Sequence, residues 1–204
     1  MKNKKGRSLI LCGLLLLAAA LGLSAYNLWD EYRAAASVES ILAQLPAPEA
    51  TPLPEGMTPD HILAPEMEMP TVAVQELDYI GTLTVPALSL DLPVLSQWSY
   101  PNLKVSPCRY AGSAYEDGFV LCAHNYRRHF GGLKDLSIGD TVQFTDVDGN
   151  TFDYVVAEIG QLDPDDTREM LSKDWALSLF TCTLGGQFRV TVRCDRAEAS
   201  SDFV

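Results

Sequence analysis

The sequence has few of the residues that build metal sites. It contains three histidines and five cysteines in 204 residues. No two cysteines form a CxxC pair and the histidines do not cluster, so we expect no zinc site. The acidic pairs Asp146/Asp148 and Asp165/Asp166 fit turn positions as well as they fit ligands. We therefore predict no metal and no cofactor.

Positive charge is also scarce. The chain has 15 Lys and Arg against 27 Asp and Glu, which gives a formal net charge of −12. Proteins that bind nucleic acid need the opposite balance, so a nucleic-acid partner is excluded. The acidity is concentrated between Asp30 and Glu76, where Arg33 is the only basic residue.

Charge is absent altogether from Ser8 to Trp29, which is mostly apolar. That length is enough to cross a bilayer as a helix. We predict that residues 1–30 are a cytoplasmic stub and transmembrane signal anchor of a single-pass cell-membrane protein. The basic residues before the run favour a cytoplasmic N-terminus, with the rest on the extracellular face. These basic residues are Lys2, Lys4, Lys5 and Arg7.

A cleaved secretory signal peptide is the alternative reading of the same segment. The stretch LGLSAYN offers small residues of the kind that a signal peptidase accepts. The apolar run is longer than a usual signal core, which favours the anchor.

Residues 31–76 have the composition of a helix followed by a spacer. DEYRAAASVESILAQL is rich in alanine and predicts that the helix continues beyond the membrane. More than half of the 12 prolines then fall between Pro46 and Pro70. Such a segment is typical of a stiff, extended stalk outside the cell and not of a packed domain.

From Leu77 the chain alternates short β-rich runs with turn signals, which predicts a small all-β barrel or sandwich over residues 77–196. TVQFTDVDGNTFDYVVAEI predicts a hairpin with its turn at 148–150. HFGGLKDLS and DTREMLSKDWA predict short helical or irregular insertions. Residues 197–204 form a C-terminal tail.

Cys182 is the residue on which function depends. It closes the apolar strand LSLFT, and a turn containing Gly185 and Gly186 leads into a second strand. Two adjacent antiparallel strands would bring Arg189 close to the thiol, where a guanidinium can stabilise a thiolate or an oxyanion. The alternatives are a disulfide or a buried thiol.

A cysteine nucleophile also needs a proton partner. His61 lies in the proline-rich stalk. His124 follows the buried-type strand GFVLCA, and His129 lies in the loop after it. A histidine at a strand end, where the core meets solvent, suits a general base, although such a residue is also often structural.

The remaining extracellular cysteines leave two possibilities open. Cys108 and Cys194 could form a disulfide, or they could be buried free thiols. Cys122 lies two residues before His124 and therefore points to the same side of its strand.

Three motifs in order resemble the sortase family, the membrane-anchored cysteine transpeptidases of Gram-positive bacteria. They are AHNYRRHFGGLKDLSIGD, LSLFTC and FRVTV. The resemblance covers roughly 77–196 and implies an eight-stranded β-barrel with short helices. It also implies roles for five residues. These are Cys182 (nucleophile), His124 (general acid and base), Arg189 (oxyanion and substrate stabilisation), and Thr181 and Asn125 (substrate contacts).

Two departures leave the class within the family unassigned. Ser178 stands where the TLxTC motif has threonine. The interval from Cys182 to Arg189 is short, which implies a tight final loop and makes Arg193 a rival for the arginine role.

The resemblance further implies a substrate and partners. The substrate would be an LPxTG-like sorting signal near the C-terminus of a secreted or surface protein. The acceptor would be an amine of the cell wall or a pilin lysine. A hydrolytic cysteine peptidase with the same site and a non-catalytic, membrane-tethered binding module are the alternatives. An L,D-transpeptidase is disfavoured because its His-Gly and Ser-x-Gly-Cys signatures are absent.

Overall fold

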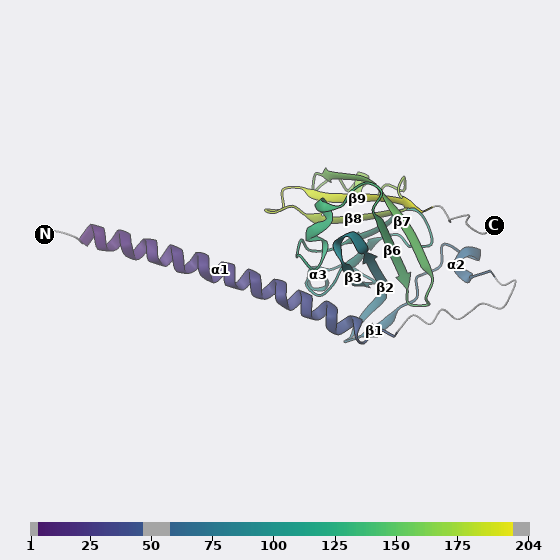
Figure 1. Ribbon diagram of the computed structural model, residues 1–204, viewed down its shortest axis with the longest axis horizontal. Helices are drawn as coiled ribbons and strands as arrows, with labels where there is room; N and C mark the ends of the chain where they lie inside the picture. The colour runs from purple at the N-terminus through teal and green to yellow at the C-terminus, as the bar shows by residue number, and fades with distance from the viewer. Residues whose placement is uncertain (1–3, 47–57, 198–204) are drawn as a thin grey trace.

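The computed structural model describes residues 4–46 and 58–197, which form one long helix and one β-barrel (Figure 1). The predicted C-terminal tail lies outside the described residues apart from Ala197. Much of the proline-rich segment, residues 47–57, also lies outside them.

The described strands form one sheet in the order β1-β2-β3-β4-β5-β8-β9-β7-β6, and β2 also pairs with β6. That second pairing closes eight strands into a barrel and leaves β1 outside it, which confirms the predicted eight-stranded architecture. The strands are β1 (Val72–Val74), β2 (Leu77–Val85), β3 (Leu90–Leu95), β4 (Cys108–Ala111), β5 (Phe119–Cys122), β6 (Thr141–Asp146), β7 (Thr151–Leu162), β8 (Leu177–Cys182) and β9 (Arg189–Arg196).

The barrel interior is filled by side chains that alternate along each strand. On β9, Val190, Val192 and Cys194 are buried in the main core. Phe119 and Phe144 meet there edge to face, with ring centroids 5.2 Å apart. Since neighbouring residues of a strand point to opposite faces, Arg189 is directed away from this core.

The connections match the predicted insertions. The β6–β7 hairpin turns at 147–150, where Asp146 accepts hydrogen bonds from the backbone N–H groups of Asp148 and Asn150. Both predicted insertions contain short helices, η2 and α4. The short helices are α2 (Asp60–Leu63), η1 (Pro86–Leu88), α3 (Tyr100–Leu103), η2 (Phe130–Asp135) and α4 (Thr167–Met170).

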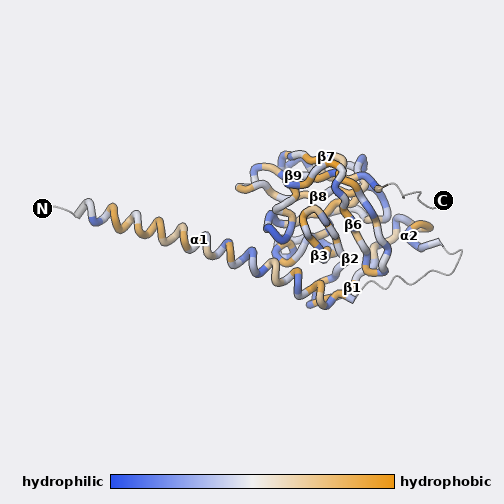
Figure 2. Tube along the Cα trace, in the orientation of Figure 1, coloured by the Kyte–Doolittle hydropathy of each residue, from blue (hydrophilic) through white to orange (hydrophobic). Residues whose placement is uncertain are grey.

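Helix α1 (Lys4–Leu42) is continuous from the apolar run into the polar segment, as predicted. Its N-terminal part is exposed and largely hydrophobic (Figure 2). By length and composition it could cross a membrane. From Asp30 onward the helix packs against the barrel, and Ala34, Val38 and Ile41 are buried.

The segment expected to be an extended stalk is different in the structure. Residues 58–76 return to the barrel, and β1 pairs with β2 in antiparallel register. Met69 and Val74 are buried. Apolar side chains among the prolines thus provide enough hydrophobic surface to hold this segment on the barrel. The number of prolines alone does not reveal this packing.

Candidate active site

Cys182 and Arg189 lie opposite each other at the ends of β8 and β9. They therefore share one face of the sheet, with the connecting turn between them. In that turn Gly185 (φ 89°) and Gly186 (φ 73°) both adopt the left-handed conformation that glycine tolerates without strain. Two consecutive glycines thus make the tight final loop possible and bring Arg189 opposite Cys182.

The guanidinium of Arg189 is anchored by the turn that it follows. Its Nη1 donates to the carbonyl oxygen of Gly186 at 3.2 Å. Both Cys182 and Arg189 are partly exposed, so neither is sealed in the core. An oxygen bound beside the thiol would find a positive donor already held in place.

His124 reaches the same end of the barrel because β5 runs parallel to β8. The backbone N–H of Ala123 donates to the carbonyl oxygen of Phe180 at 3.3 Å. The Thr181 hydroxyl donates to the carbonyl oxygen of Ala123 at 2.8 Å. Both bonds join Ala123, which precedes His124, to the two residues before Cys182, and so hold His124 and Cys182 on neighbouring strand ends.

Thr181 itself is buried, with its hydroxyl occupied by Ala123. This position supports a structural role and not the direct substrate contact expected from the resemblance. Asn125 follows His124 and is partly exposed at the start of the loop. No side-chain hydrogen bond involves Asn125 in the described part of the chain.

His124 has neighbours that the sequence did not reveal. Its ring lies 5.0 Å from that of Tyr126, whose hydroxyl donates to the carboxylate of Asp30 on α1. Burial lowers the pKa of His124, while the charge of Asp30 acts to raise it. The Tyr126 hydroxyl and Arg33 hold the pKa of Asp30 below its usual range. An acidic residue at the end of a long apolar run gives no sequence signal that it lies near a histidine 94 residues later in the chain.

Neither of the other two histidines follows the strand end beside Cys182, although the ring of His129 contacts that of Tyr126 with centroids 5.4 Å apart. The ring of His61 stacks on Tyr115 with centroids 5.0 Å apart. His129 is fully buried, and neither of its ring nitrogens has a hydrogen-bond partner among the described residues. Burial lowers the pKa of His129 to about 4.

Arg193, the other candidate for the arginine role, is buried and stabilises the fold. It is only 2% exposed. Its guanidinium donates to the Ser178 hydroxyl at 2.7 Å and to the carbonyl oxygen of Glu169 at 2.7 Å. It fastens α4 to β8, and its pairing partner Ser178 lies four residues before Cys182 on β8.

All five cysteines are free thiols. Cys108 lies in the cluster under α1, whereas Cys194 lies in the main barrel core, so the suggested bridge between them does not form. Burial raises the pKa of each of these thiols to about 12. Cys122 pairs with Cys108 across β4 and β5, and burial raises its pKa as well. Outside α1, Cys182 is the one cysteine that is not buried.

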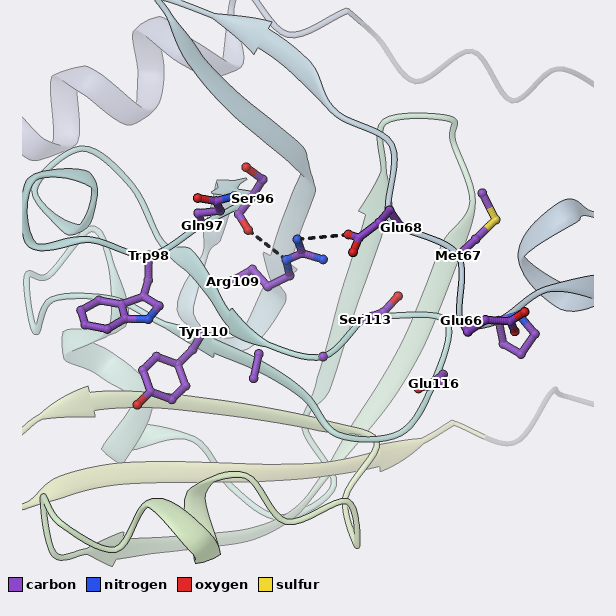
Figure 3. A pocket seen from close by; sticks show the side chains of 13 residues that line it. Glu66, Met67, Glu68, Ser96, Gln97, Trp98, Arg109, Tyr110, Ser113 and Glu116 are labelled. Atoms are coloured by element: carbon purple, nitrogen blue, oxygen red, sulfur yellow. Dashed lines mark hydrogen bonds and ion pairs between the residues drawn. The ribbon is translucent and has the colours of Figure 1, made fainter.

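Three aromatic rings in contact extend from β8 to a cavity of about 540 Å³, whose lining side chains are shown in Figure 3. Phe180, two residues before Cys182 on the same face, packs edge to face against Tyr110 at 5.2 Å. Tyr110 in turn packs against Trp98 at 5.5 Å. Trp98 and Tyr110 line the cavity together with Glu68 and Arg109, whose charged groups lie 3.6 Å apart.

The described residues include no group of three or more His, Cys, Asp or Glu side chains placed to hold a metal ion. Asp146, one of the acidic residues considered in the sequence, is buried and accepts hydrogen bonds within its own turn and from Tyr115. Asp166 caps α4 by accepting from the backbone N–H of Glu169.

A closed barrel that brings a cysteine, a histidine and an arginine to neighbouring strand ends is suited to covalent acyl transfer. The Sortase domain family model matches residues 83–197, more than half of the chain. The chain therefore belongs to the sortase family and is a cysteine transpeptidase of the sortase kind. No curated protein matches the chain.

Solved sortase structures share the fold. Sortase C1 from Streptococcus agalactiae is 25% identical with a TM-score of 0.55, and the match covers 72% of this chain and 80% of that chain. A Clostridium perfringens sortase D5 transpeptidase is 16% identical with a TM-score of 0.58, covering 82% of this chain and 99% of that one. C. perfringens sortase C with the C-terminal cell wall sorting motif is 23% identical with a TM-score of 0.52, covering 60% and 72%. The last two are similar in fold alone.

Proposed function

We propose that this protein cleaves an LPxTG-like sorting signal of secreted or surface proteins and transfers the acyl group to an amine. The observation that carries the proposal is the pairing of Cys182 with Arg189, with His124 fixed on the adjacent strand by the Thr181–Ala123 bond. The substrate class comes from the family resemblance. It agrees with the solved structure of C. perfringens sortase C, which contains the C-terminal cell wall sorting motif.

The reaction proceeds in two halves. The Cys182 thiolate attacks the scissile carbonyl carbon, and a C–S bond forms while Arg189 stabilises the oxyanion. His124, as imidazolium, gives its proton to the leaving amine as the C–N bond breaks, and a thioester remains. The acceptor amine then attacks the thioester and loses its proton to His124. The new amide leaves, and Cys182 is released as thiolate.

The cavity beside the aromatic row is a natural place for part of the bound peptide. Its volume of about 540 Å³ lies in the range of small-ligand sites. Tyr110 and Trp98 offer apolar faces, while Glu66, Glu68 and Glu116 offer acceptors.

We place the catalytic domain on the extracellular side, with α1 as the single membrane span. The acceptor is an amine of the cell wall or a pilin lysine.

Mass spectrometry of the full chain in detergent micelles tests the proposal. The protein is incubated with an LPxTG-type peptide library, with and without an added amine. We expect an acyl adduct on Cys182 that is absent in Cys182→Ala and that the amine converts to an amide product.

Two other outcomes would contradict transpeptidation. Release of free acid at an unchanged rate when amine is added would identify a hydrolytic peptidase. An unmodified Cys182 across the whole library would favour a binding module.

A further inference from the structure

We propose that the end of the barrel carrying Cys182, His124 and Arg189 rests on the membrane that α1 crosses. There, Lys104, Arg127 and Arg128 bind anionic phospholipid headgroups, and the β8–β9 turn enters the interface. This inference rests on the membrane insertion of α1 in the proposed function. It adds a lipid-binding surface formed by the catalytic loops themselves.

The first observation is the point on α1 where contact with the barrel begins. Residues 6–29 are all exposed. Contact between the helix and the barrel starts at Asp30, the first charged residue after the apolar run. Asp30 accepts a hydrogen bond from Tyr126, and the next residue, Glu31, accepts from the backbone N–H of Arg127 at 3.0 Å. The loop after His124 is therefore level with the first turn of helix beyond the bilayer.

The aromatic residues of α1 mark the same level. Tyr26 and Trp29 are both exposed, and their ring centroids lie 6.0 Å apart. Tyrosine and tryptophan are enriched at the headgroup level of membrane proteins. Because Trp29 directly precedes Asp30 in a continuous helix, the barrel has no spacer that could lift it from the surface.

The charges on this side of the barrel have the sign that an anionic surface attracts. Arg127 and Arg128 are exposed, and so is Lys104, whose carbonyl oxygen accepts from Arg33 on α1. None of the three forms an ion pair within the described chain. In a protein with a net charge of −12 they would be expected to find acidic partners. Basic residues near a membrane surface are attracted by anionic lipids.

The β8–β9 turn supplies the apolar part of the surface. Leu184 is 93% exposed, the highest value among the large apolar side chains of the described residues. The turn projects from the barrel on the side where the N-terminal part of α1 lies (Figure 1). Its tip is hydrophobic (Figure 2). A leucine that is exposed in water in this position would be buried in the interfacial region of a bilayer.

The consequence concerns substrate access. Cys182 and Arg189 are the residues on either side of this turn, so the site opens close to the bilayer. Substrates that are themselves tethered to the membrane would reach the thiol without leaving the surface.

Fluorescence quenching by brominated lipids tests the contact in the full chain inserted into lipid nanodiscs. Leu184→Trp is compared with Leu63→Trp. Leu63 is also highly exposed, at 71%, but lies on α2 at the far side of the barrel from the N-terminal part of α1 (Figure 1). In discs rich in phosphatidylglycerol we expect the tryptophan at 184 to be quenched severalfold more than the one at 63, after the wild-type signal is subtracted. Equal quenching at the two positions would overturn the proposal.

The basic residues are tested in the Leu184→Trp background. We expect Arg127→Gln combined with Arg128→Gln to reduce quenching in phosphatidylglycerol to the level seen in phosphatidylcholine. The control is Lys173→Gln. Lys173 lies beside Gly118 at the opposite end of β5, and this change should leave quenching unaltered. Quenching that ignores both the lipid charge and the two arginines would refute headgroup binding.

The outcome is separable from that of the proposed function. Trp29 is the one tryptophan of α1, and its quenching in a background with Trp98→Phe and Trp175→Phe reports insertion of α1 directly. Acyl-enzyme formation with a soluble peptide is measured on the same protein and does not depend on where the barrel rests.

Discussion

Arg189 and Arg193 lie on the same face of β9, but their surroundings differ. Arg189 is opposite Cys182, whereas Arg193 is opposite Ser178 and is enclosed by carbonyl groups of α4. We therefore expect matched substitutions to separate catalysis from stability.

Arg189→Gln should lower kcat/KM by about 10²- to 10³-fold, the usual effect of removing an oxyanion donor. It should change the free energy of unfolding by less than about 0.5 kcal/mol, as at other sites without buried contacts. Arg193→Gln should instead lower the free energy of unfolding by about 2–4 kcal/mol, because buried acceptors lose a charged donor. Acyl-transfer kinetics and urea unfolding of both variants measure the two effects. The opposite pattern would assign the oxyanion role to Arg193.

Thr181 gives a second test at the residue scale. Thr181→Val keeps the shape but removes the donor to the Ala123 carbonyl, which should cost about 1–3 kcal/mol of stability. Because that bond fixes the strand ends that carry His124 and Cys182, the rate of thioester formation should fall as well. Thr181→Ser retains the hydroxyl and serves as the control. If the valine and serine variants acylate equally fast, the bond does not position the site.

At the scale of elements, α1 has two sections with different environments. The first is exposed and apolar, and the second buries Ile41 in a cluster with Tyr79, Leu95 and Cys108. The same helix therefore serves as the candidate membrane span and as a packed layer on the outside of β2 and β3.

Ile41→Ala should destabilise the docked section by about 2–5 kcal/mol, the range for removing a buried aliphatic side chain. Hydrogen exchange of residues 30–45 in the micelle-bound protein measures it, and exchange should be faster there than in the wild type. Glu39→Ala, at an exposed position of the same helix, should leave exchange unchanged. Unaltered exchange in Ile41→Ala would show that the helix is held by its polar contacts alone.

At the scale of the whole molecule, buried His129 couples stability to pH. Its pKa in the fold is about 4, below the ordinary 6.5, because burial disfavours the charged ring. As pH falls below 6.5 the unfolded chain takes up a proton that the folded chain does not. Stability should therefore be complete above about pH 6.5 and should decrease toward pH 4, by up to about 1.4 kcal/mol per pH unit.

His129→Phe removes this titration without breaking a hydrogen bond of the ring, since neither nitrogen has a partner among the described residues. Urea unfolding of the wild type and the variant between pH 4 and pH 8, with other groups common to both, isolates the contribution. A difference between them that does not change with pH would contradict the assignment.

Features that depend on local patterns could be predicted from the amino-acid sequence. The uncharged run, the alternating strands and the Asp-Gly-Asn turn each follow from side-chain periodicity and backbone preference. The pairing of Cys182 with Arg189 could also be predicted, because a short turn between antiparallel strands leaves little choice of partner. The motif order then pointed to the family.

Tertiary structure alone decided which distant residues meet. His124 lies beside Cys182 because β5 and β8 run in parallel, a pairing that no local pattern specifies. Asp30 lies near His124 because the C-terminal part of α1 packs against the barrel. The proline-rich segment packs because a few of its apolar side chains contact a complementary surface. Arg193 is not the active-site arginine because its guanidinium binds carbonyl groups of α4. These are outcomes of packing, and packing depends on the three-dimensional fit of the whole chain.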